Sequence, residues 1–252
     1  MQGVLYVSHG SRVKEAAQQA VSFLEDVKKK VDVPLQEICF LELAEPDIAA
    51  GAAKLVEQGA LNITVIPVLL LSAGHYYEDI PEEIEEVKRR HPQISFTYGK
   101  PIGVQERVID IAVDRIRETG VPVKENASLL VVGRGSRDPQ TKQDIEHIAG
   151  RLKEKTGAVH ADVCYLAACS PSFDEGLEKA LERAAPQTFV VPYLWFTGIL
   201  MQTMQQKIDH LSDEDRGFIL CSYLGDHPNM IDALAARVYE ALPAGVGKGE
   251  SR

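Results

Sequence analysis

The sequence predicts an α/β protein made of two tandem, duplicated domains, each with a four-stranded, mostly parallel sheet flanked by helices. One observation is an internal repeat, because LYVSHGSR at Leu5–Arg12 returns as LVVGRGSR at Leu130–Arg137. A second is that the same offset of 125 positions relates Cys39 to Cys164. A third is the alternation of strand and helix patterns in both halves, which is typical of a parallel sheet. A repeat that extends over several strands indicates two copies of one domain.

The first half alternates strands and helices in chain order. Its strands are expected at Gly3–Ser8, Leu35–Leu41, Asn62–Leu71 and Ile94–Tyr98, and its helices at Arg12–Val31, Glu45–Gln58, Asp79–Arg90 and Val104–Thr119. The run Val65–Leu71 is apolar throughout, which is typical of a parallel strand covered on both faces. We therefore expect helices on both faces of this sheet.

The helix after the third strand carries signals at both ends. Asp79, followed three positions later by Glu82, resembles a capping box, in which the first side chain caps the helix N-terminus. Acidic residues in the first turn and the basic run Lys88–Arg90 in the last turn complement the helix dipole. These signals predict a helix over residues 79–90.

The second half repeats the pattern. Its strands are expected near Ser128–Gly133, Ala161–Leu166, Gln187–Phe196 and Gly217–Tyr223. The segment Pro122–Asn126 is the expected link between the halves, which places the domains at residues 1–122 and 127–242. Residues 243–252 contain three glycines and no apolar period, so they are expected to form a flexible tail.

The composition excludes several classes of function. An apolar fraction of 45% and a charged fraction of 25% are typical of a soluble globular protein, and no stretch approaches the roughly 18 apolar residues of a membrane span. The net charge of −10 opposes binding to nucleic acid or to anionic membranes. The four cysteines lack the spacing of zinc or redox motifs, and no secretory signal is present. We therefore expect a cytoplasmic protein.

Comparison of the two copies isolates residues that the fold does not require. His9, Glu42 and His75 face Arg134, Ala167 and Leu200 in the second copy, although the sequence around them is retained. Each of the three lies at or just after the carboxyl end of a predicted strand, where open parallel sheets bind ligands. They follow one another at intervals of 33 residues. We expect them to meet at one edge of one sheet.

Two imidazoles and one carboxylate make a site for a divalent transition metal ion such as iron, cobalt, nickel or zinc. Three protein ligands leave coordination positions open, so that the ion can be passed on or can act on a substrate. Histidine also accepts protons near neutral pH. The trio therefore predicts metal chemistry with proton transfer, or a carrier that binds metal without turnover. A divalent-metal hydrolase is a third reading, for which nothing in the sequence selects an activated water.

The loop after the first strand has two interpretations. Gly10 lets consecutive backbone amides turn towards an anion, with Ser11 and Arg12 as further donors. Alternatively, the Gly-Ser pair in both copies only forms the tight turn from strand to helix. Arg134, at the matching place of the second copy, favours a division in which that copy holds carboxylates while the first does the chemistry.

The remaining histidines lack such a context. No special role is expected for His91, His147, His160 and His210, and His227 is expected to be a helix-entry residue. The sequence also contains no glycine-rich nucleotide motif and no serine-hydrolase elbow.

Several segments together resemble the sirohydrochlorin chelatases. They are Leu5–Arg12, Phe40–Glu42, Pro67–His75 and Asp79–Pro81. The resemblance covers the chain except its tail, and it is strongest to the SirB-type sirohydrochlorin ferrochelatases, which are related to the CbiX cobaltochelatases. It implies two chelatase-type domains with a cleft between them. It also implies insertion of Fe²⁺ into sirohydrochlorin, a step of sirohaem biosynthesis.

The expected roles follow from the trio and from this resemblance. His9 is expected to be a metal ligand and proton acceptor, His75 a metal ligand, and Glu42 a ligand or charge balance. Substrate contacts are implied for Ser11, Arg12, Glu45, Leu70, Leu71, Ser72, Ala73, Gly74 and Arg134. Fe²⁺ is then a substrate, with Co²⁺ or Ni²⁺ as further candidates, and no tightly bound cofactor is expected. The only partners expected are sirohydrochlorin and the metal ion, bound by a monomer.

Iron is favoured over cobalt by what the chain lacks. Long cobaltochelatases carry a histidine-rich stretch and a C-terminal cysteine motif for an iron–sulfur cluster, and neither occurs in this sequence. The alternatives are a cobaltochelatase of the cobalamin pathway and a non-catalytic carrier of metal or tetrapyrrole, because related donor sets accept several of these ions.

Overall fold

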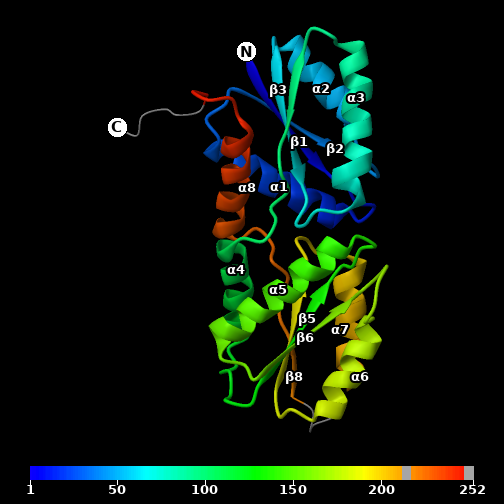
Figure 1. Ribbon diagram of the computed structural model, residues 1–252, viewed down its shortest axis with the longest axis vertical. Coiled ribbons are helices and arrows are strands. Elements are labelled where there is room, and N and C mark those ends of the chain that lie inside the picture. The colour runs from blue at the N-terminus through cyan, green and yellow to red at the C-terminus, as the bar shows by residue number, and fades with distance from the viewer. Residues whose placement is uncertain (212–216, 247–252) are drawn as a thin grey trace. The chain divides into compact units, whose positions relative to one another are not determined.

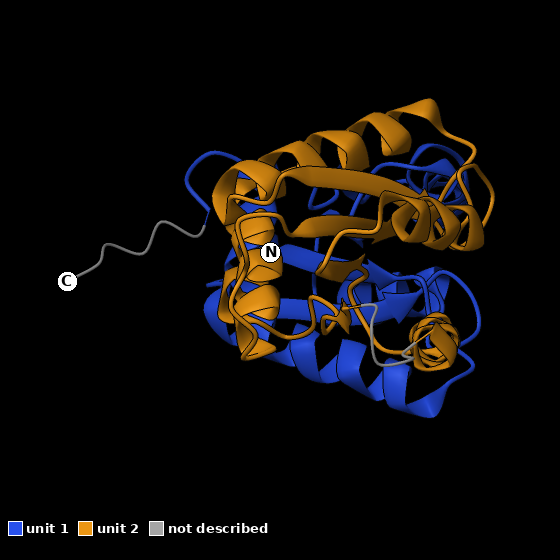
Figure 2. Cartoon of the chain, turned by 90° about the horizontal axis from the view of Figure 1, so that it is seen from below, with its two compact units in different colours: residues 1–103, 231–252 blue, residues 104–230 orange. Residues whose placement is uncertain are grey.

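The computed structural model, shown in Figure 1, describes residues 1–211 and 217–246 and divides into two compact units. Unit 1 comprises Met1–Gly103 and Ile231–Arg252, and unit 2 comprises Val104–Met230. Figure 2 colours the two units separately. Each unit contains one four-stranded sheet with helices packed against it, as the duplication predicts.

Unit 1 is built on a sheet in the order β2-β1-β3-β4. Its elements are β1 (Gln2–Ser8), α1 (Lys14–Lys30), β2 (Leu35–Phe40), α2 (Ile48–Glu57), β3 (Asn62–Val68), the π-helical turn η1 (His75–Asp79), α3 (Ile80–Arg90) and β4 (Ser95–Tyr98). All three pairings are parallel, with Ser8 opposite both Phe40 and Val68. The carboxyl ends of β1, β2 and β3 are therefore neighbours at one edge.

Unit 2 repeats this sheet in the order β6-β5-β7-β8, again with parallel pairings. Its elements are α4 (Glu106–Glu118), β5 (Ser128–Gly133), α5 (Pro139–Thr156), β6 (His160–Tyr165), α6 (Phe173–Arg183), β7 (Thr188–Tyr193), α7 (Ile199–Leu211) and β8 (Phe218–Leu220). The last helix, α8, covers Pro228–Ala241. The two sheets match strand for strand, which confirms the duplicated α/β fold.

Alternating strand residues divide the core of unit 1 between two faces of the sheet. Leu5 and Val65 belong to a buried cluster that includes residues of α2 and α3. On α3, this cluster takes Ile80, Ile84 and Val87, one side of an amphipathic helix. Figure 1 shows α1 and α8 on the opposite face. Buried residues on both faces explain the continuous apolar runs in β1 and β3.

The last helix of each sequence repeat belongs mostly to the compact unit of the other repeat. In the chain, α4 follows β4, yet it belongs to unit 2, while most of α8 belongs to unit 1. In unit 2, Glu106 of α4 pairs with Arg151 (2.8 Å) and Lys155 (2.9 Å) of α5. In unit 1, the Tyr239 hydroxyl of α8 accepts a hydrogen bond from the Asp32 amide (3.0 Å). The expected domains, 1–122 and 127–242, follow the repeat and so differ from these units.

Two strands are shorter than their apolar runs predict. We expected strands through Leu71 and Phe196, but β3 ends at Val68 and β7 at Tyr193. Beyond these ends the backbone pairs with other loops instead of strands. Leu69 and Leu70, for example, accept hydrogen bonds from Ile102 (2.9 Å) and Gly103 (2.8 Å). The apolar sequence continues beyond Val68 and Tyr193, but the hydrogen-bonded pairing between strands ends there.

Of the expected flexible tail, residues 247–252 lie outside the described residues. Within 243–246, the Val246 amide donates to the Pro243 carbonyl (3.1 Å). Among the helices that the structure describes, none is long and apolar enough to cross a membrane.

Candidate metal centre

The three residues that distinguish the first repeat converge in the structure. One ligand atom each from His9, Glu42 and His75 lies within 4.8 Å of the others. His9 Nε2 is 3.2 Å from Glu42 Oε1, and the two imidazole rings meet edge to face with centroids 4.7 Å apart. In the part of the chain that the structure describes, no other three His, Cys, Asp or Glu side chains form such a group.

The strand order explains why residues so far apart in the chain meet. Because β1 lies between β2 and β3, the loops after all three strands emerge side by side. Two backbone hydrogen bonds then tie the first two loops together, from Leu41 to Ser8 (2.8 Å) and from Glu42 to His9 (3.1 Å). These bonds hold the two loops side by side, so that the His9 and Glu42 side chains start from neighbouring points in space.

Gly10 makes the close approach of these loops sterically feasible. Its φ is +91°, and a Cβ atom at this position would lie 1.9 Å from the Glu42 carbonyl oxygen. Gly135 has the same conformation, with φ +92° and the same separation from the Ala167 oxygen. The fold therefore requires glycine in both copies, whereas it does not require histidine at position 9.

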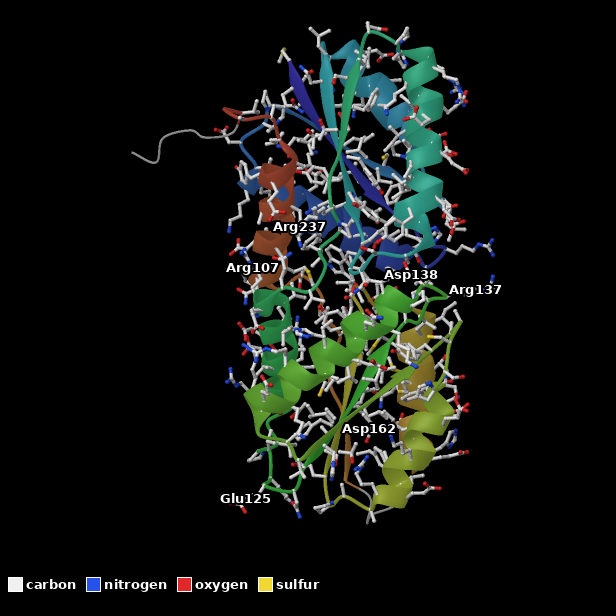
Figure 3. All side chains as sticks on the ribbon, viewed as in Figure 1. Arg107, Glu125, Arg137, Asp138, Asp162 and Arg237 are labelled. Carbon is white, nitrogen blue, oxygen red and sulfur yellow. The ribbon has the colours of Figure 1, made fainter. Side chains whose placement is uncertain are left out.

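The serine after each of these glycines also serves the turn. Ser11 Oγ accepts a hydrogen bond from the Val13 amide (3.1 Å), and Ser136 Oγ accepts one from Asp138 (3.0 Å). In unit 2 the Asp138 carboxylate, labelled in Figure 3, caps α5 by accepting from Gln140 (2.9 Å). The tight-turn interpretation of the Gly-Ser pair thus has a structural basis in both units.

The trio is partly open to solvent. Side-chain exposure is 28% for His9, 29% for His75 and 50% for Glu42. An arriving ion can therefore reach the donors without opening a core. Three of the four thiols are poor alternatives, because burial raises the pKa of Cys39 and raises the pKa of Cys164 and Cys221 to about 12.

A fourth polar side chain touches the trio and was missed at the sequence level. His75 Nδ1 lies 2.6 Å from Asp79 Oδ2. The predicted capping box is wrong, because Asp79 has helical backbone angles and caps nothing in α3. The spacing of four residues between His75 and Asp79 was the available signal, since such residues share one side of a helix.

The residues expected to contact substrate lie on both repeats. Leu70, Leu71, Ser72, Ala73 and Gly74 form the loop between β3 and η1, immediately before His75. Arg12 and Glu45 are exposed in unit 1, next to loops that carry His9 and Glu42. Arg134 is exposed at the end of β5 in unit 2. His227 is a helix-entry residue as expected, since its Nδ1 accepts from the Asn229 amide (3.2 Å).

Comparison with known protein families accounts for nearly the whole chain. The family model described as CbiX matches residues 3–119 and again residues 128–241. The chain is 50% identical to a sirohydrochlorin ferrochelatase of Priestia megaterium, over 96% of this chain and 91% of that protein. It is 43% identical to the corresponding protein of Bacillus subtilis, over 98% and 94%. A sirohydrochlorin cobaltochelatase of Priestia megaterium is 35% identical, over 96% and 80%.

Solved structures of sirohydrochlorin chelatases are also similar to this chain over nearly its whole length. SirB from Bacillus subtilis with Fe³⁺ superposes with a TM-score of 0.88 at 44% identity, covering 95% of both chains. The chelatase SirB from Bacillus subtilis subspecies spizizenii in complex with cobalt gives a TM-score of 0.84 at 40% identity, covering 95% of this chain and 94% of that one.

Proposed function

The chain belongs to the CbiX family, and from this premise we propose that it is a sirohydrochlorin ferrochelatase. It inserts Fe²⁺ into sirohydrochlorin, as the names of its full-length relatives indicate. The observation that carries the proposal is the convergence of His9, Glu42 and His75 at one sheet edge. A set of two imidazoles and one carboxylate binds ferrous iron and leaves positions open for exchange.

Insertion requires that Fe²⁺ lose its water ligands and that the macrocycle lose two pyrrole protons. His9, Glu42 and His75 replace water in the first step. As the ion moves from these donors to the pyrrole nitrogens, His9 Nε2 is released and can accept a pyrrole proton. Glu42, 3.2 Å from that nitrogen, stabilises the resulting imidazolium. His9 passes this proton to water and then accepts the second one, so that the two N–H bonds broken are balanced by two protons released to water.

Substrate recognition is assigned to the loop before His75 and to exposed cationic groups. Leu70 and Leu71 are partly buried apolar side chains that suit one face of the macrocycle, and Ser72–Gly74 continue that wall. Arg12 and Arg134 are exposed guanidinium groups that suit its carboxylates, with Ser11 as a further donor. Glu45, exposed beside the Glu42 loop, is assigned a substrate contact by its place.

Cobalt insertion is a second candidate for the same site. It is favoured by the full-length cobaltochelatase relative and by the cobalt complex of a SirB structure. Imidazole and carboxylate donors separate these ions poorly. Comparison of kcat/KM for Fe²⁺, Co²⁺ and Ni²⁺ under anaerobic conditions decides which ion the enzyme prefers.

The chain is further proposed to act as a cytoplasmic monomer, without a tightly bound cofactor and without nucleic acid. All three metal donors come from one chain, so the site needs no second copy. The cysteines are free thiols, which fits a reducing compartment. Light scattering after size-exclusion chromatography tests the oligomeric state.

Turnover counting tests the proposal itself. Purified protein, excess Fe²⁺ and excess sirohydrochlorin are mixed without oxygen, and the absorbance of the metallated product is followed. The enzyme is expected to form many product molecules per chain. Formation of one product or fewer per chain would identify a carrier instead.

A further inference from the structure

The contact between His75 and Asp79 has the geometry of a strong hydrogen bond. His75 Nδ1 and Asp79 Oδ2 are 2.6 Å apart, which is shorter than an ordinary N–H···O bond, and hydrogen bonds to an ionised acceptor are shorter and stronger than neutral ones. A carboxylate oxygen acts as an acceptor in such a contact, so the imidazole donates through Nδ1–H. Nε2 is then the nitrogen of His75 that carries a lone pair for a metal ion.

From this geometry we infer that Asp79 is a positioning residue for metal binding at His75. Its carboxylate fixes the imidazole tautomer and ring orientation and makes Nε2 a better ligand. Carboxylates that bind the second nitrogen of a metal-ligating histidine have this effect. The inference deepens the proposed function, on which it rests for the role of the metal ion as substrate.

The local backbone is built to bring the two side chains together. His75 and Asp79 are the first and last residues of η1, and the Ile80 amide closes the π-helical turn on the His75 carbonyl. The turn is anchored to β4, because the Tyr98 hydroxyl donates to the Tyr76 carbonyl (2.9 Å) and the two rings stack at 5.1 Å. Both ends of the His75–Asp79 pair are thus held by the fold.

The second repeat shows that this turn is not required by the fold. The buried positions Ile80 and Ile84 of α3 correspond to Met204 and Ile208 of α7, an offset of 124. The preceding strands correspond at an offset of 125, so the first repeat holds one extra residue between strand and helix. The wider π turn accommodates this residue, whereas α7 is a regular helix from its start at Ile199.

The histidine and the carboxylate are absent together from the second repeat. In the helix register of 124, His75 and Asp79 correspond to Ile199 and Thr203. In the strand register of 125, they correspond to Leu200 and Met204, so neither register offers an imidazole or a carboxylate. A π turn confined to the repeat with the metal donors indicates a functional insertion.

Nuclear magnetic resonance of the metal-free protein tests the contact directly. With ¹⁵N-labelled histidine, His75 is expected in the Nδ1–H tautomer, and Asp79→Ala is expected to let it exchange between tautomers. Glu78→Gln is the matched control, since it removes a carboxylate from an exposed position of the same turn. A His75 signal that is unchanged by Asp79→Ala would overturn the inference.

Titration with Co²⁺, followed by its visible absorption bands, tests the consequence. Asp79→Ala is expected to weaken binding by about 10- to 100-fold, and Asp79→Asn, which keeps an acceptor oxygen, by less. In a His75→Ala background, Asp79→Ala is expected to add no further loss. The inference is contradicted if Asp79→Ala weakens Co²⁺ binding no more than Glu78→Gln does. It is also contradicted if Asp79→Ala weakens Co²⁺ binding just as much in the His75→Ala background. Neither assay uses sirohydrochlorin, so failure of turnover alone would count only against the proposed function.

Discussion

His9 and Arg134 occupy equivalent loops with equivalent backbones, so their difference reflects chemistry rather than folding. The neighbouring Gly10 and Gly135 share their positive φ and their contact with a carbonyl oxygen. This comparison made the convergent trio His9, Glu42 and His75 predictable from sequence, because residues that the scaffold requires could be separated from those it does not require. Asp79 was not predictable in the same way, since the same residue is also a common helix cap, and only the turn geometry decides between the two.

Gly10→Ala is expected to abolish metal binding and to destabilise unit 1. The added Cβ would lie 1.9 Å from the Glu42 oxygen, so the Glu42 loop must move away from His9. The left-handed conformation alone costs alanine roughly 1–2 kcal/mol. Urea unfolding and Co²⁺ titration measure the two effects.

Gly135→Ala provides the matched control for that variant. It creates the same strain against Ala167 in a unit without the metal trio. A similar loss of stability with native Co²⁺ affinity is expected. Native Co²⁺ affinity in the Gly10→Ala variant would contradict the proposed tie between backbone and site.

At the scale of elements, the strands were predictable and the partners of the last helices were not. Apolar runs identify buried strands, and the repeat identifies which strands of the two copies correspond. The sequence adjacency of β4 and α4 gives no sign that α4 belongs to unit 2, because both repeats offer a similar amphipathic helix to a similar sheet. The distinction rests on side chains such as Arg115 and Arg237, whose contacts are tertiary.

Arg237→Met is expected to lower the free energy of unfolding by about 1–3 kcal/mol, because it leaves a carbonyl without its donor. Arg237, on α8 in Figure 3, donates to the Ile102 carbonyl through Nη2 (2.7 Å) and Nε (3.1 Å). The Ile102 amide in turn donates a hydrogen bond to the carbonyl of Leu69, which lies next to the loop that leads to His75. A modest loss of Co²⁺ affinity is therefore expected as well.

Arg115→Met separates stability from metal binding. Its Nη2 donates to the Leu224 carbonyl (2.7 Å), the equivalent contact in unit 2. This variant is expected to lose comparable stability in urea while Co²⁺ affinity stays native. If Arg237→Met and Arg115→Met changed Co²⁺ affinity equally, the proposed connection from α8 through Ile102 to the loop before His75 would be refuted.

Glu106 makes the packing of α4 sensitive to acid. Hydrogen bonds from Arg151 and Lys155 lower the pKa of Glu106 to about 2. Because the pKa is lower in the folded state, the stabilisation is present above the unfolded pKa near 4.5 and is lost as pH falls towards 2. Glu106→Gln is expected to flatten the fall of the urea midpoint in this window. Glu57→Gln, at the end of α2, serves as control, and an unchanged slope in Glu106→Gln would contradict the assignment.

At the scale of the whole molecule, duplication has produced two matching sheets that carry different side chains at equivalent loop positions. The proposed metal donors all lie in unit 1, and unit 2 keeps the loop but places arginine at the position of His9. The sequence shows this difference between the copies because the repeat is well preserved. It did not predict the assignment of helices to units, which depends on packing between segments far apart in the chain.

The two units are expected to give opposite kinetic signatures when these equivalent residues are changed. Arg134→Ala is expected to raise KM for sirohydrochlorin, by loss of a carboxylate partner, with little change in kcat or in Co²⁺ affinity. His9→Ala is expected to lower kcat by at least about 100-fold, as for loss of a general base. Steady-state kinetics distinguishes the two variants. A lower kcat with native KM in Arg134→Ala would contradict the assignment of Arg134 to substrate binding.

The central claim is that His9, Glu42 and His75 hold the metal ion before it enters the macrocycle. A crystal structure of the protein soaked with Co²⁺, with anomalous scattering measured at the cobalt edge, tests it most directly. One strong anomalous peak is expected within coordination distance of His9, Glu42 and His75. A principal peak at any other site, with these three side chains left uncoordinated, would contradict it.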